Sequence, residues 1–130
     1  MVIMRTINKL IVHCSDTPND RFVSVDDIRK WHVEENGWSD IGYHYVIYRN
    51  GDVKQGRSVS IIGAHCRGQN KNSIGVCLIG RDNFTPAQKQ SLNNLYATLD
   101  GCYPSLKVFG HRDFTELKTC PNFDVKDVIK

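Results

Sequence analysis

The sequence predicts a single α/β domain in which helices flank a central mixed β-sheet. Strand-like and helix-like segments alternate along the 130 residues, an order typical of this class. Asn50-Gly51 is a strong short signal for a β-hairpin and predicts one antiparallel strand pair. Residues 73–79 form an almost continuous apolar run, as expected of a central strand that is buried on both faces.

The first half of the chain predicts a strand, a helix and the two strands of the hairpin. Residues 7–13 are rich in Ile, Leu and Val, which favour strands. Ser24 precedes a pair of acidic residues and marks the start of a helix that should run to about Glu35. The aromatic-rich segment 43–49 predicts a strand, and residues 52–55 predict the strand that returns after the turn.

The second half predicts one long helix and a last strand. Residues 56–71 show little periodicity and indicate an irregular loop. Thr85, followed by proline, begins a helix that should end near Gly101. Residues 106–110 predict the last strand, and Asp124 begins a short terminal helix. The core stripe of the long helix is expected to consist of Leu92, Leu95, Tyr96 and Leu99.

Composition excludes several classes of protein. The net charge of +3 is only mildly basic and forms no concentrated stripe, so we expect no nucleic-acid partner. No apolar run is long enough to span a membrane, and the first residues lack a secretory signal. The chain is therefore expected to be made in a bacterial cytoplasm. Five cysteines without such a signal argue against a disulfide framework.

Two histidines stand where an apolar strand gives way to turn-forming residues. His13 ends the first strand and His111 follows the last one, so both would lie at the carboxyl edge of the sheet, where ligands gather. Cys120 follows nine residues after His111. Two imidazoles and a thiolate can hold a catalytic zinc ion, with the fourth position left to water. Spacing alone leaves open the alternative that each side chain is an ordinary surface or hydrogen-bonded residue.

Six stretches of the chain together resemble a known enzyme family. The sequence is similar to the zinc-dependent N-acetylmuramoyl-L-alanine amidases of type 2, which share a fold with peptidoglycan recognition proteins. The matching stretches occur in the family's order over nearly the whole chain, so residues 1–130 are interpreted as one amidase domain. They are IVHCS (11–15), IRKWH (28–32), GWSDIGYHY (37–45), NSIGVCLIG (72–80), FTPAQ (84–88) and KTCP (118–121).

The resemblance implies a complete catalytic site. His13, His111 and Cys120 would bind one zinc ion per chain, and Tyr43 and Lys118 would be the catalytic side chains beside it. Zinc polarises a carbonyl and activates water, while a cation and a phenol can stabilise the oxyanion that forms. The implied reaction is hydrolysis of the amide between the lactyl group of N-acetylmuramic acid and L-alanine in peptidoglycan.

Other residues near these motifs have weaker assignments. His65 and Asn72 lie in or beside the irregular loop and are candidates for substrate binding, because loops often carry ligand contacts. Arg112 and Asp113 are candidates for the hydrogen-bonded outer partner that a metal-bound imidazole usually has. Glu116 is interpreted as a solvent-facing acid rather than a base.

Three other functions stay open from the sequence. The chain could be a non-catalytic peptidoglycan-binding module, although an intact ligand set argues against this. It could regulate an RNA polymerase, as a phage relative does, but such binding is unlikely here because the amino-terminal extension differs. A cysteine hydrolase that uses Cys14 or Cys77 is the third option. We expect a monomeric phage endolysin that reaches the cell wall after holin-type release; a secreted toxin or a recycling enzyme fits the same residues.

Overall fold

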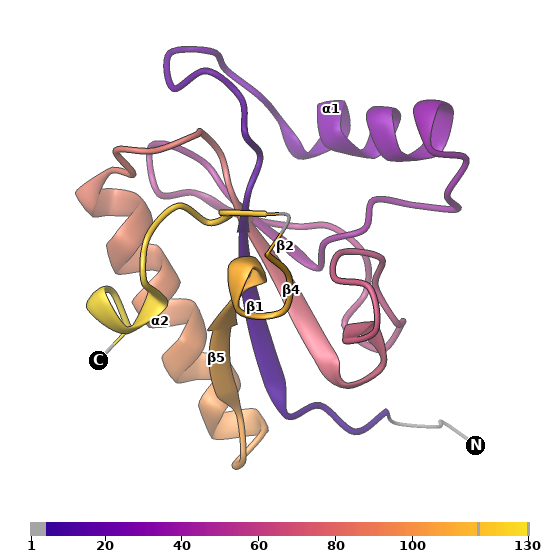
Figure 1. Ribbon diagram of the computed structural model, residues 1–130, viewed down its shortest axis with the longest axis vertical. Helices are drawn as coiled ribbons and strands as arrows, with labels where there is room; N and C mark the ends of the chain where they lie inside the picture. Colours follow the sequence, from indigo (N-terminus) through magenta and orange to yellow (C-terminus); the bar gives the residue numbers. More distant parts are fainter. Residues whose placement is uncertain (1–4, 117, 130) are drawn as a thin grey trace.

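A five-stranded mixed sheet forms the centre of the computed structural model, which describes residues 5–116 and 118–129 (Figure 1). The strands are β1 (Lys9–Cys14), β2 (Tyr45–Ile47), β3 (Val53–Gln55), β4 (Ser73–Leu78) and β5 (Lys107–Gly110). Their spatial order is β3-β2-β4-β1-β5. β1 is parallel to both β4 and β5, β2 is parallel to β4, and only β3 is antiparallel to its neighbour. The mixed sheet predicted from the sequence is confirmed.

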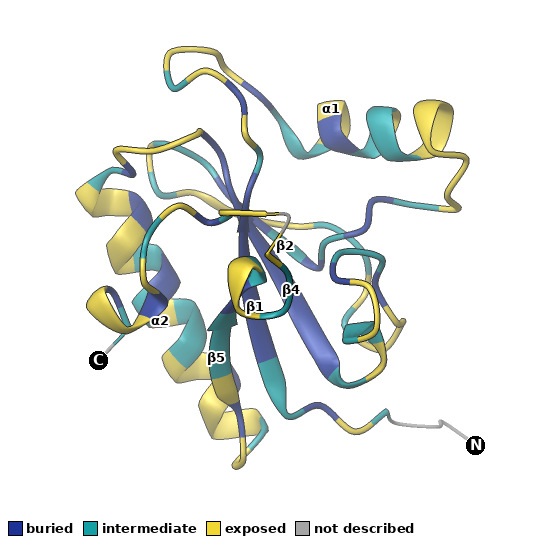
Figure 2. Ribbon diagram, viewed as in Figure 1, coloured by how far each residue is buried: buried dark blue, intermediate teal, exposed yellow. Residues whose placement is uncertain are grey.

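The apolar strand that the sequence places at the centre of the sheet is central. All six residues of β4 are buried, and β4 pairs with β1 on one side and β2 on the other (Figure 2). Such a strand contributes to the core on both faces, which explains its lack of polar alternation.

Helix α2 (Pro86–Cys102) covers one face of the sheet. The hydroxyl of Thr85 accepts a hydrogen bond from the N–H of Gln88, whose side chain in turn caps Thr85, so the predicted helix start is confirmed. Leu92 and Leu99 are buried among residues of β1 and β4, and Leu95 and Tyr96 pack at the edge of this core. We call this cluster the α2-side core.

Helix α1 (Val25–Lys30) covers the opposite face (Figure 1). It continues into a π-helical turn, Trp31–Glu35, that is closed by the N–H of Asn36 bonding to the carbonyl of Trp31. The predicted end near Glu35 is therefore confirmed, with a wider last turn than an α-helix has. Ile28 is buried here against Ile41, Val46, Cys77 and Ile79 in what we call the α1-side core.

The hairpin strands are shorter than the sequence predicts. β2 covers three residues instead of the seven predicted at 43–49, because the chain already turns at Tyr48, whose carbonyl accepts the N–H of Gly51. Gly51 has a φ of +93°, a conformation that favours glycine.

Near the carboxyl end of the chain, a short 3-10 turn, Val125–Asp127, begins at Asp124 as expected. Among the described residues we find no helix with the length and apolarity that a membrane span requires.

Candidate metal centre

His13 and His111 lie side by side because their strands are parallel neighbours. Val12 of β1 pairs with Gly110 of β5, so the next residue of each chain segment emerges at the same edge of the sheet. The Nδ1 atoms of the two imidazoles are 3.1 Å apart. His13 is almost completely buried, while His111, in the 3-10 turn His111–Asp113, is half-buried.

Cys120 reaches the histidines from the loop that follows β5. The N–H of Arg112 donates to the carbonyl oxygen of Cys120 over 2.8 Å, and the N–H of Cys14 donates to its Sγ atom over 2.6 Å. One ligand atom from each of His13, His111 and Cys120 lies within 4.8 Å of the other two. The hydrogen bond to the Cys14 thiol and burial raise the pKa of the Cys120 thiol, and the peptide N–H directed at its sulfur opposes this rise. A bound metal ion would deprotonate the thiol, because the thiolate is the form that binds metals.

The protonation states of the imidazoles suit a metal ion. Burial lowers the pKa of His13 well below its usual value, and the neighbouring His65 and His111 lower this pKa further. Burial, and then the charge of Lys118, lower the pKa of His111. Both rings are therefore neutral near pH 7 and offer a lone pair. Ligand atoms of a tetrahedral zinc ion are about 3.4 Å apart, close to the separation of the two Nδ1 atoms, so this donor set fits zinc.

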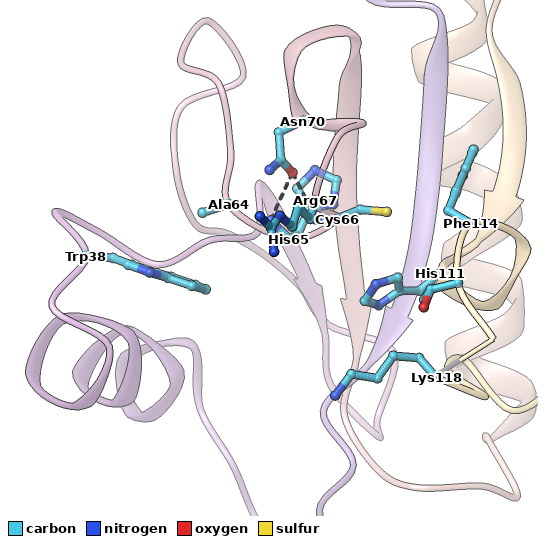
Figure 3. Close-up of a pocket in the computed structure, with 10 residues that line it drawn as sticks. Trp38, Ala64, His65, Cys66, Arg67, Asn70, His111, Phe114 and Lys118 are labelled. Atoms are coloured by element: carbon cyan, nitrogen blue, oxygen red, sulfur yellow. Dashed lines mark hydrogen bonds between the residues drawn. The ribbon is translucent and has the colours of Figure 1, made fainter.

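Tyr43 and Lys118 line the same cavity as these three residues, a space of about 430 Å³. The ring of Tyr43 lies 5.1 Å from that of His13, measured between centroids. Burial raises the pKa of the Tyr43 hydroxyl well above its ordinary value, so the group remains a proton donor at neutral pH. The exposed Lys118 extends beside His111, as Figure 3 shows.

A second cavity of about 470 Å³ adjoins the first, and His111 and Lys118 line both. Trp38 faces these two residues across the opening (Figure 3). Phe114 adds a second aromatic wall and Arg67 a second cation, and the described residues that line this cavity are all neutral or basic. This second cavity is called the cleft below.

Comparison with known proteins connects this geometry to an enzyme family. The family model described as N-acetylmuramoyl-L-alanine amidase matches residues 4–123. The chain belongs to this amidase family. It is 45% identical to the endolysin of Escherichia phage T7 over 125 residues, which cover 90% of this amidase and 82% of the phage protein.

Two solved structures show the same fold as this amidase. The N-acetylmuramoyl-L-alanine amidase LysC from Clostridium intestinale superposes with a TM-score of 0.87 at 27% identity, covering 97% of this chain and 88% of LysC. Drosophila peptidoglycan recognition protein LB gives a TM-score of 0.82 at 28% identity, covering 93% and 78% of the two chains. The family and the fold implied by the sequence resemblance are therefore confirmed.

The two candidates for substrate binding occupy different places in the amidase. His65 lines the cleft, but both of its ring nitrogens lie within hydrogen-bond distance of protein groups. Asn72 ends the 3-10 turn Asn70–Asn72 directly before β4. Its amide donates to the carbonyl of Thr6 over 3.0 Å, and it does not line the cleft. The asparagine that does line the cleft is Asn70, which no sequence motif singled out. Its Oδ1 atom accepts the N–H groups of His65 and Cys66.

Among the described residues, the acidic side chains near His111 form no hydrogen bond or ion pair with its ring. Glu116 is exposed and lines neither cavity, in agreement with its interpretation as a solvent-facing acid. The carboxylate of Asp113 accepts the N–H of Gly110 over 2.8 Å and so closes the turn that carries His111. Asp113, which the sequence suggested as an outer partner of the imidazole together with Arg112, is instead a backbone cap. It positions the main chain of the turn rather than the His111 ring.

Burial and orientation argue against a cysteine nucleophile. Cys77 has no exposed surface, and burial raises the pKa of its thiol well above the ordinary value. Cys14 is buried in the α2-side core, and its Sγ atom lies 3.1 Å from that of Cys120. A buried thiol of high pKa is a poor nucleophile, which argues against Cys77. Cys14 borders the first cavity and its hydrogen bond with the Cys120 thiol lowers its pKa, but the side chain packs into the α2-side core and its sulfur is engaged by Cys120, so Cys14 does not fit the cysteine hydrolase alternative either.

Proposed function

We propose that this protein is a zinc-dependent, endolysin-type amidase that hydrolyses the bond between the lactyl group of N-acetylmuramic acid and L-alanine in peptidoglycan. The observation that carries the proposal is the convergence of His13, His111 and Cys120 at one edge of the sheet, in a chain of the amidase family. His13 and His111 would each bind the ion through Nδ1, and Cys120 through its thiolate.

Bound there, zinc would polarise the scissile carbonyl and lower the pKa of a water molecule toward neutrality. The side chains of the cavity have complementary tasks. The ammonium group of Lys118 would stabilise negative charge on the carbonyl oxygen, because this cation lines the cavity beside His111. Tyr43 keeps its proton at neutral pH and would donate a hydrogen bond to the same oxygen.

The cleft would hold the substrate on one side of the scissile bond. Trp38 and Phe114 offer apolar surface for a sugar ring or an alanyl methyl group. Arg67 and Lys118 give the cleft a positive character that suits the carboxylates of a stem peptide. The substrate class is therefore a muropeptide or intact cell-wall peptidoglycan. We propose that the protein acts as a monomer and reaches the wall after holin-type release.

Mass spectrometry of purified peptidoglycan after incubation with the zinc-loaded protein tests this function. We expect stem peptides with a free L-alanine amino terminus, and glycan chains that keep their lactyl groups. Cys120→Ser should abolish release. Cys102→Ser is the matched control, because Cys102 is exposed at the end of α2 and lines neither cavity. Chelation should stop the reaction and zinc should restore it.

The cysteine hydrolase and the binding module each predict a different result. A cysteine hydrolase would keep its activity after chelation and lose it on alkylation. A zinc-loaded protein that binds several types of wall but creates no new termini would be a binding module, and the proposed amidase activity would be wrong.

A further inference from the structure

His13 is hydrogen-bonded on the side of its ring that faces away from the other candidate ligands. Its Nε2 atom lies 2.9 Å from Nδ1 of His65, and the Nε2 atom of His65 lies 3.2 Å from the hydroxyl of Ser73. The three side chains form a continuous row behind the metal centre. His13 and Ser73 are at most 1% exposed, so the row is shielded from solvent at both ends.

The direction of these hydrogen bonds follows from the metal centre. The Nδ1 atom of His13 faces Nδ1 of His111 and is the atom that would bind the ion, so it must carry no proton. The proton of the neutral ring is then on Nε2, which donates to Nδ1 of His65. His65 consequently carries its own proton on Nε2 and donates to the Ser73 hydroxyl. One assignment of protons satisfies every member of the row.

The surrounding backbone holds His65 in this position. The side chain of Asn70 accepts the N–H of His65 and so fixes the loop at this residue. The ring packs against Gly75 of β4, where a Cβ atom would come within 2.5 Å of the imidazole. Ser73 is the first residue of the same strand and is completely buried. The loop and β4 therefore set the orientation of the ring before any ligand binds.

We propose that His65 and Ser73 are positioning residues that fix the tautomer and the orientation in which His13 offers Nδ1 to the metal ion. This inference rests on the proposed function, because it takes His13 as a zinc ligand. It replaces the prediction that His65 binds substrate: both ring nitrogens are engaged within the protein, and only carbon atoms remain for a substrate in the cleft. Partners of this kind orient ligands and typically change metal affinity 10–100-fold.

Zinc affinity, measured by competition with a chromophoric chelator, tests the proposal without reference to catalysis. His65→Leu should weaken zinc binding about 10–100-fold, and Ser73→Ala should weaken it less. His65→Asn should restore most of the affinity, because the Asn carbonyl can take the place of Nδ1 as the acceptor for His13. Ser91→Ala is the matched control: it also removes a side-chain hydrogen bond, from the Ser91 hydroxyl to the carbonyl of Gly51, but on α2 away from the centre.

Two further readouts separate positioning from a structural or substrate role. Nitrogen-15 NMR of the zinc-loaded protein should show His13 protonated at Nε2, and urea unfolding of each metal-free variant should show that it folds. A His65→Leu variant that folds and binds zinc like the wild type, with only a higher KM, would overturn the proposal in favour of substrate contact. Loss of affinity in His65→Asn equal to that in His65→Leu would also overturn it. A wild-type protein that binds zinc but does not cleave peptidoglycan would refute only the proposed function.

Discussion

The imidazole ring of His65 lies directly against the α-carbon of Gly75. A Cβ atom at residue 75 would be 2.5 Å from Cγ, 2.6 Å from Cδ2 and 2.7 Å from Nδ1 of His65. These separations are far below van der Waals contact, so the strand can carry only glycine at this position while the ring keeps its place. The glycine of the central strand and the histidine of the irregular loop are one structural unit.

Gly75→Ala should therefore act on the metal centre from within the sheet. The added methyl group must displace the His65 ring, so we expect zinc affinity to fall about as far as in His65→Leu, roughly 10–100-fold, together with a loss of about 1–3 kcal/mol of stability from overpacking. Isothermal titration and urea unfolding measure the two effects.

Gly101→Ala is the control for this substitution. Gly101 lies in α2, and a Cβ atom there would meet nothing within 4 Å. This variant should gain about 0.5–1 kcal/mol from helix propensity and bind zinc normally. Unchanged zinc affinity in Gly75→Ala would show that the contact between Gly75 and His65 does not control metal binding.

Lys118→Met should separate catalysis from metal binding. Lys118 lines both cavities but supplies no ligand atom, so its loss should lower kcat about 10²–10³-fold and leave zinc affinity within a few-fold of the wild type. Steady-state hydrolysis of a defined muropeptide gives kcat. Lys89→Met, on the exposed face of α2, should not change the rate. Equal rates for the Lys118 variant and the wild type would rule out its assigned role.

Gln88 should be the polar residue of α2 that contributes most to stability. It is completely buried, and its amide donates to the carbonyls of Ile47 and Ile79 while its Oε1 atom accepts the N–H of Thr85. Gln88→Leu leaves these buried groups without that partner, and the expected cost is about 2–4 kcal/mol in the free energy of unfolding. Gln90→Leu, at an exposed position of the same helix, should change stability by less than about 0.5 kcal/mol. Similar values for both variants would show that the buried amide is dispensable.

The elements that the sequence predicted well are those with a local cause. The Thr85 cap, the hairpin turn at Gly51 and the apolar strand β4 each depend on residues close together in the chain. The meeting of His13 and His111 was also predictable, because the edge at which parallel strands end follows from their direction.

The outer partner of the metal centre was not predictable in this way. The sequence pointed to Arg112 and Asp113 because they adjoin His111, but the carboxylate of Asp113 caps the backbone. The ring that is supported is that of His13, and its partner His65 is 52 residues away along the chain. His65 sits in a segment without periodicity, so its orientation depends on Asn70 and Gly75, which touch it only in the folded chain. A glycine inside an otherwise apolar strand was the one available signal of a close approach.

Acid should destabilise the metal-free protein through His44. This residue is fully buried; its Nδ1 atom accepts the N–H of Gly75 over 3.0 Å and its Nε2–H donates to the carbonyl of Ile61 over 2.8 Å. Burial lowers the pKa of His44 to about 4, and the neighbouring charges of Arg5 and Arg57 also lower it. Protonation would place a donor against the N–H of Gly75, so the folded state resists it. The guanidinium of Arg5 lies 3.1 Å from Nε2 of His44, and the His65 ring, centred 5.9 Å away, is a further titratable group near it.

The sign of the effect follows from comparing the two states. The pKa of His44 in the folded state, about 4, lies below the value of about 6.5 expected in the unfolded chain, so the unfolded state binds more protons between these values. The contribution of His44 to stability is therefore complete above pH 6.5 and is lost as the pH falls toward 4, by about 3 kcal/mol in total. Urea unfolding of the metal-free protein at pH 7, 6, 5 and 4.5 should show a decline at least this steep, because the lowered pKa values of His13 and His65 act in the same direction. His44→Asn keeps an acceptor for Gly75 but has no titratable group. Its free energy of unfolding should be lower than that of the wild type at pH 7. With falling pH it should decrease less steeply, the difference in slope being up to about 1.4 kcal/mol per pH unit. Parallel curves for the two proteins would show that other groups control the acid response.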